Sequence, residues 1–100
     1  MSAVALPFGT YYEIIPASTT GQVLGLTGAK GDTLMRLIVT VTVAATGTVA
    51  LLDGATSYTL VAATTPVGVY DLTINAQSAN GAWSVTTGAG ATVMAVGNFV

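Results

Sequence analysis

The sequence predicts an all-β protein with about eight short antiparallel strands, arranged as a jelly-roll-like β-sandwich that works as an oligomer. Apolar and polar residues alternate with a period of two along much of the chain, as they do in strands with one face on a core. Turn signals rich in glycine separate these segments at the spacing of about 8–12 residues that is typical of sandwiches and barrels. No long segment repeats with the helical period.

The first half of the chain is expected to contain an arm and four strands. Residues 1–10 include Pro7 and Gly9, and we interpret them as an N-terminal arm that precedes a single domain at 11–100. Pro16 closes the first strand and marks it as an edge strand, because proline is tolerated where no ladder partner is needed. The four strands are expected at 11–15, 22–26, 33–44 and 48–53.

The segment 33–44 has the clearest strand pattern. Its alternation predicts one face on the core and one face away from it. The expected core face carries Met35, Leu37, Val39, Val41 and Val43, and the expected outer face carries Leu34, Arg36, Ile38, Thr40 and Thr42.

The second half is expected to supply four more strands, at 57–63, 67–75, 82–87 and 92–98. The turn signals between them are Asp53-Gly54, Pro66, Asn80-Gly81 and Gly88-Ala89-Gly90. Within 67–75, alternation places Tyr70, Leu72 and Ile74 on one face, and Asp71, Thr73 and Asn75 on the other.

The scarcity of charge predicts association with other chains. Only 6% of the residues are charged, although soluble domains average about 25%. A monomer of this size exposes about 5,000 Å², or about 850 Å² for each charge, while one partner in a standard interface contributes about 800 Å². The segment 92–98 is apolar on both faces, with Val93 and Ala95 opposed to Met94 and Val96. Such a strand needs cover on both sides.

Several functional classes lack the residues that they need. Without histidine, the serines lack their usual activating base, and no motif supports Lys30 in that role. The chain also has no cysteine, and its four carboxylates are spread along it, so we expect neither an enzyme nor a cofactor. Two basic residues are too few for nucleic acid. Arg36 and several threonines interrupt the most apolar run, so we expect no membrane span. The N-terminus also lacks the pattern of a signal peptide.

The aromatic residues allow two interpretations. Trp83, together with Tyr11, Tyr12, Tyr58 and Tyr70, could form a sugar-stacking platform. Alternatively, Trp83 anchors the core or a subunit interface, where tryptophan and tyrosine are enriched. We favour the second interpretation.

Two segments resemble a known group of proteins. Residues 11–39 read YYEIIPASTTGQVLGLTGAKGDTLMRLIV, and residues 81–99 read GAWSVTTGAGATVMAVGNF. They resemble small structural proteins encoded beside the head genes of tailed bacteriophages, and are most similar to capsid decoration, or cement, proteins. The resemblance implies a β-sandwich that forms a homotrimer on the outer surface of the virion capsid and ties neighbouring major capsid protein subunits together. It implies no catalytic residue.

The alternative function is a receptor- or glycan-binding β-domain of a phage tail fibre or adhesin, which predicts exposed aromatic residues around Trp83. For the cement function, we expect the subunit or capsid interface to be formed by apolar and aromatic side chains. The candidates are Leu6, Phe8, Tyr11, Tyr12, Trp83, Met94, Val96 and Phe99.

Overall fold

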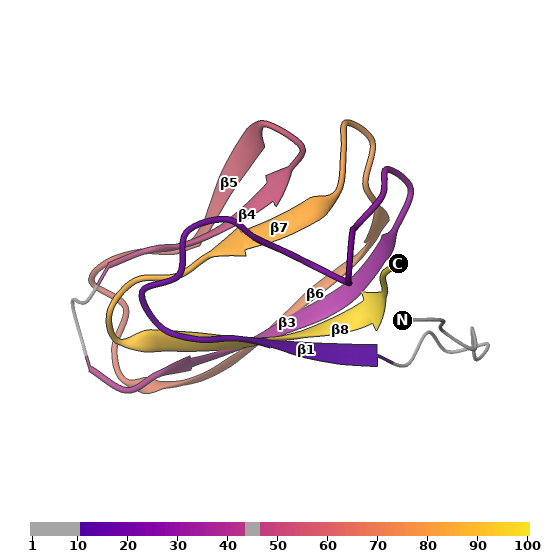
Figure 1. The fold of residues 1–100 in the computed structure, drawn as a ribbon. Coiled ribbons are helices and arrows are strands. Elements are labelled where there is room, and N and C mark those ends of the chain that lie inside the picture. Colours follow the sequence, from indigo (N-terminus) through magenta and orange to yellow (C-terminus); the bar gives the residue numbers. More distant parts are fainter. Residues whose placement is uncertain (1–10, 44–46) are drawn as a thin grey trace.

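The computed structural model describes residues 11–43 and 47–100, and these contain eight strands and no helix (Figure 1). The arm expected at 1–10 and the end of the strand expected at 33–44 therefore lie outside the described residues. No helix in the described part has the length and apolarity to cross a membrane. The strands are β1 (Tyr11–Ile15), β2 (Gln22–Val23), β3 (Thr33–Val41), β4 (Val49–Asp53), β5 (Thr56–Val61), β6 (Gly68–Gln77), β7 (Trp83–Thr86) and β8 (Ala91–Asn98).

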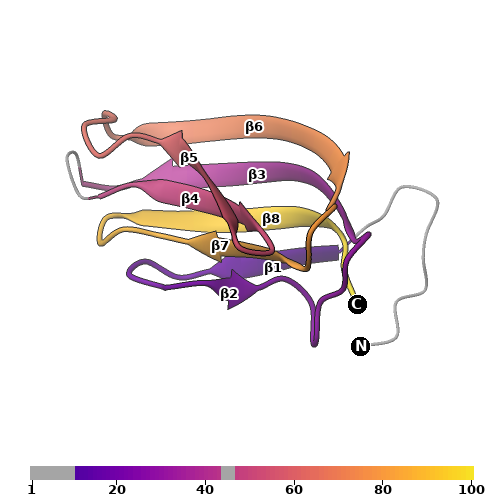
Figure 2. The same cartoon turned by 90° about the horizontal axis from the view of Figure 1, so that it is seen from above.

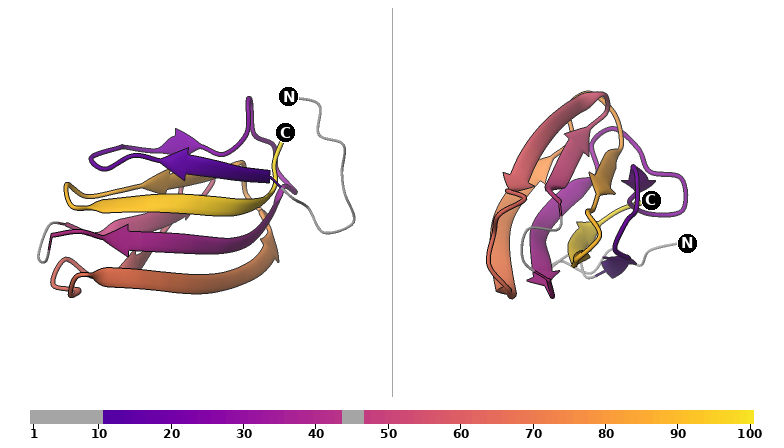
Figure 3. Two further views of the ribbon diagram at one scale, coloured as in Figure 1. Left: turned by 90° about the horizontal axis from the view of Figure 1, so that it is seen from below. Right: turned by 90° about the vertical axis from the view of Figure 1, so that its left-hand side faces the viewer.

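The strands form two antiparallel sheets in a β-sandwich-like arrangement. The first sheet has the order β1-β8-β3-β6 and the second has the order β2-β7-β4-β5. The chain is paired like one long hairpin, with β1 on β8, β2 on β7, β3 on β6 and β4 on β5. Further pairing of β3 with β8 and of β4 with β7 completes the sheets. Figure 2 looks down on the two stacked sheets, and the right-hand view of Figure 3 shows them end-on as separate layers.

The core lies between the two sheets. Both sheets contribute fully buried side chains, including Leu37 and Val93 from the first and Val49 and Val85 from the second. The alternation predicted for 67–75 is confirmed: Tyr70, Leu72 and Ile74 pack against the core, while the intervening side chains are exposed. Burial of each large apolar side chain contributes about 1.5–3 kcal/mol, so the inward faces dominate the stability of the fold.

A β-bulge changes the faces of β3. The register of β3 with both neighbours shifts between Leu34 and Arg36. As a result, Leu34 is fully buried and Met35 is only half-buried, so the expected placement of these two residues is wrong. The extra residue of the bulge reverses the alternation at that point. Val43 was also expected on the core face, but β3 ends at Val41 and Val43 is 56% exposed.

The segment after β2 leaves the sheet earlier than expected. The strand predicted at 22–26 ends at Val23. Gly25 has a φ of 92°, and a Cβ at this position would collide with the carbonyl oxygen of Val100. That oxygen accepts hydrogen bonds from the backbone N–H groups of Thr27 and Gly28, at 3.1 and 2.8 Å. The chain therefore turns out of β2 to bind its own last described residue.

Candidate interaction surface

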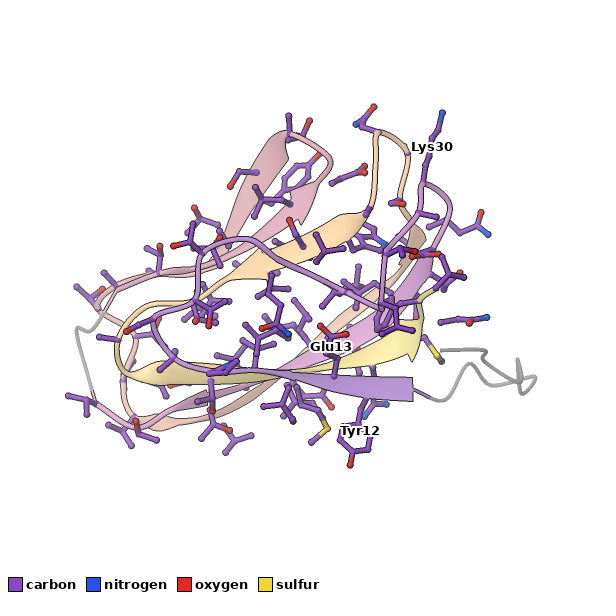
Figure 4. All side chains as sticks on the ribbon, viewed as in Figure 1. Tyr12, Glu13 and Lys30 are labelled. Carbon is purple, nitrogen blue, oxygen red and sulfur yellow. The ribbon has the colours of Figure 1, made fainter. Side chains whose placement is uncertain are left out.

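The outer face of the first sheet carries a continuous apolar patch. Alternation along β1 directs Tyr12 away from the core and Glu13 toward the second sheet, as Figure 4 shows. Tyr12 is 68% exposed and Ile14 is 50% exposed. In the register, Tyr12 lies opposite Val96 and Ile14 lies opposite Met94, which in turn lies opposite Ile38. We call these residues, Tyr12, Ile14, Ile38, Met94 and Val96, the apolar patch.

An exposed ion pair borders the apolar patch. The Nη1 atom of Arg36 lies 3.3 Å from Oδ2 of Asp71, and both side chains are about half exposed. Arg36 lies opposite Val96 in the register, so the pair adjoins the patch on the β6 side. Such exposed pairs contribute about 0–1 kcal/mol to stability. The main effect of this pair is that the border of the patch carries no net charge.

The outer face of the second sheet has a different composition. Ser84 and Thr86 of β7 lie opposite Leu52 and Ala50 of β4, and Ser57 and Thr59 of β5 lie on the far side of β4. Val23 of β2 also lies opposite Ser84, so Ser84 separates the two large apolar residues of this face, Val23 and Leu52. Contiguous exposed apolar surface marks interaction sites in soluble proteins, so the first sheet offers the stronger candidate.

The structure separates the interface residues predicted from the sequence into four groups. Tyr12, Met94 and Val96 belong to the apolar patch, whereas Leu6 and Phe8 lie outside the described residues. Tyr11 lies in β1 opposite Gly97. Trp83 and Phe99 are 5% and 2% exposed, so the core of a single chain already covers them and leaves little surface for a partner.

Two members of the apolar patch were not among the predicted residues. Ile14 lies two residues after Tyr12 in β1 and therefore on the same face of the strand, so the alternation of the first strand could have predicted it. Ile38 was expected on the outer face of its strand, but only the register shows that it lies beside Met94.

Trp83 is part of the core and does not form an exposed platform for sugars. Its indole N–H donates a hydrogen bond of 2.9 Å to the carbonyl oxygen of Asp32. This bond satisfies the single polar group of a buried tryptophan. The groove of exposed aromatics that the glycan-binding alternative predicts around Trp83 is therefore not formed by this residue.

Two buried carboxylates, Asp53 and Asp32, stabilise turns. Asp53 accepts hydrogen bonds from the backbone N–H groups of Ala79 and Asn80. The bond from Asn80 is the largest cause that lowers the pKa of Asp53, and burial opposes it. Asp32 accepts a bond of 2.9 Å from the N–H of Ala29. Across residues 11–43 and 47–100, no three residues of the kinds that ligate metals come together.

These features define a small all-β protein with one apolar outer face and carboxylates that hold its backbone in place. Comparison of the chain with models of protein families, with curated proteins and with solved structures found no match. The function of this chain is therefore inferred from its surface and from the resemblance described above.

Proposed function

We propose that the protein is a capsid decoration, or cement, protein, which binds as a homotrimer to the outer surface of an icosahedral phage head and stabilises contacts between major capsid protein subunits. The observation that carries this proposal is the apolar patch on a chain with so few charges. Burying apolar surface contributes about 25 cal/mol per Å². It also avoids the desolvation penalty that charged groups would incur.

The chemistry of the surface suits this role. A cement protein has to occupy many identical sites without catalysing a reaction. A patch of five apolar side chains gives each subunit a contact of modest size. Linking three such contacts in one trimer raises the overall affinity, because the second and third contacts form intramolecularly.

The topology also supports a virion protein. We infer that the two sheet orders, together with the hairpin-like pairing of the chain, make a jelly roll. Jelly rolls of eight strands occur in viral capsid domains and in lectins. The buried Trp83 favours the capsid role over the lectin role, since the sugar platform was expected around this residue.

The proposal is tested by adding the purified protein to phage heads that lack it and measuring bound protein by sedimentation. The wild type is expected to bind in a fixed ratio to the major capsid protein. Ile14→Lys places a charge in the apolar patch, so its affinity should fall about thirtyfold, which corresponds to a hot-spot loss of about 2 kcal/mol.

The matched control is Leu26→Lys, because Leu26 is 72% exposed and lies outside the apolar patch. This variant should bind like the wild type. Failure of the wild-type protein to bind any head, or equal binding by the two lysine variants, would refute the proposal.

A further inference from the structure

The free edge of β6 differs from the other three sheet edges. Among the described residues, β6 pairs with β3 alone. The strand is ten residues long and contains no lysine, arginine or proline. Its register with β3 is unbroken from Gly68 to Thr73 and shifts between Thr73 and Ala76, so the regular part of this edge has six residues. A long regular edge offers a row of unpaired backbone N–H and C=O groups, which is the template for adding another strand.

The other edges carry features that discourage strand addition. The strand β1 has five residues and is followed by Pro16, and β2 has only two residues. The register of β5 shifts where β4 passes from Val49 to Ala50, which leaves only Thr56–Thr59 unbroken, against the six residues Gly68–Thr73 of β6. Short strands, prolines and bulges are the devices that proteins use to protect edges. Figure 2 shows β6 along one side of the molecule, away from β1.

The side chains along β6 also lack complete cover. Tyr70, Leu72 and Ile74 face the core but remain only partly buried. The single charged residue of the strand, Asp71, is already paired with Arg36 on the neighbouring strand. Its charge is therefore a weak barrier to an approaching strand.

We infer that β6 pairs antiparallel with β6 of a second copy of this chain around a two-fold axis, which joins two four-stranded sheets into one sheet. This inference does not depend on the proposed function. A two-fold contact through the edge of β6 is separate from the apolar patch and cannot by itself build a trimer.

The alternation of β6 limits the register of this contact. Directly opposite residues point to the same face, so only registers that pair even positions with even positions keep Tyr70, Leu72 and Ile74 on the core side. A register centred on Asp71 would place two carboxylates opposite each other, which is destabilising. A register centred on Thr73 would use Asn75, whose φ of 50° departs from strand geometry.

The register centred on Leu72 keeps the two Asp71 carboxylates apart, and its five central pairs lie within residues 70–74, so that Asn75 is not among them. It places Leu72 opposite Leu72, Tyr70 opposite Ile74, and Asp71 opposite Thr73. All core-side pairs are then apolar, and each carboxylate faces a threonine hydroxyl that can donate a hydrogen bond to it.

Two substitutions of Thr73 test the inference by native mass spectrometry and sedimentation equilibrium. Thr73→Asp would place a carboxylate opposite Asp71 at both symmetry-related positions of the dimer, so the dimer dissociation constant should rise at least about tenfold. Thr73→Lys would oppose the same carboxylates with positive charge, so the dimer should persist or tighten. Thr73 lies opposite Arg36 within its own chain. Within one chain, Thr73→Asp therefore places a negative charge beside Arg36 and should stabilise the monomer, whereas Thr73→Lys places a positive charge there and should destabilise it. This order is the reverse of the order expected for the dimer, so a folding defect cannot mimic the result.

Cysteine cross-linking tests the register, because the natural sequence contains no cysteine. Under mild oxidation, Asp71→Cys alone and Thr73→Cys alone should stay uncross-linked, while an equimolar mixture should give a disulfide-linked dimer. Circular dichroism of each variant verifies its fold. Dimers from either single variant would overturn the Leu72 register. A wild type that stays monomeric at high concentration, together with an uncross-linked mixture, would overturn the pairing itself.

Discussion

The Nε2 atom of Gln22 donates a hydrogen bond of 2.7 Å to Oε2 of Glu13, and this bond joins the two sheets. Glu13 belongs to β1 of the first sheet and Gln22 to β2 of the second. The other carboxylate oxygen of Glu13 accepts a bond of 2.8 Å from the N–H of Gly25. The inward-facing carboxylate therefore holds β1, β2 and the following turn together at one edge of the fold.

Glu13→Ala is expected to lower the free energy of unfolding by about 2 kcal/mol, since hydrogen bonds to a charged group contribute about 1.5–3 kcal/mol. Glu13→Gln keeps one carbonyl acceptor and should lose about half as much. Urea denaturation, followed by the fluorescence of the single tryptophan, measures both losses. Equal stability of Glu13→Ala and the wild type would contradict this role of the carboxylate.

Asp53 is expected to make the stability of the protein sensitive to acid. Its pKa in the folded state is lowered below the ordinary value of 3.8, chiefly by the hydrogen bond from the backbone of Asn80. The unfolded chain therefore binds this proton more readily, so the stabilisation is complete above the unfolded pKa and is lost as the pH falls through the folded pKa.

Thermal unfolding of the wild type and of Asp53→Asn between about pH 2 and pH 6 isolates this contribution. The unfolding midpoint of the wild type should fall more steeply below about pH 4, because the asparagine cannot titrate. Parallel curves for the two proteins would show that Asp53 does not contribute to the acid sensitivity.

Gly97→Ala is expected to destabilise the fold by about 1–3 kcal/mol, as overpacking of a core does. A Cβ at this buried position would collide with the carbonyl oxygen of Thr33 and lie 2.8 Å from Cζ of Phe99. In the matched control, Gly68→Ala, the nearest atom would be the Tyr70 hydroxyl at 3.4 Å, which is an ordinary contact. The control should stay within about 0.5 kcal/mol of the wild type in the same denaturation experiment.

Alternation predicted the fold well where strands are regular and failed where one is irregular. It correctly assigned the faces of Leu72 and Asp71 in β6, because no register shift intervenes there. It failed at Leu34 and Met35, since a bulge depends on pairing with β6 and β8 and leaves no trace in the hydropathy of β3. The two sheets and their antiparallel strands were predictable, but the strand order was not.

The candidate surface was predictable only in part. Tyr12 and Met94 could be named individually, but their proximity arises because β1 pairs with β8, and pairing between distant segments is not encoded in local alternation. Composition likewise could not distinguish a core tryptophan from an interface tryptophan, so Trp83 and Phe99 were grouped with Tyr12. The cement function and the homotrimer remain predictions.

The positions of β7 and β8 have a consequence for the synthesis of the chain. These two strands are synthesised after the other six, yet β8 lies between β1 and β3, and β7 lies between β2 and β4. Neither sheet can close before they arrive, and β1 and β2 have no neighbour until then. Contacts between such distant segments slow folding. We therefore expect the nascent chain to remain open until both strands have left the ribosome.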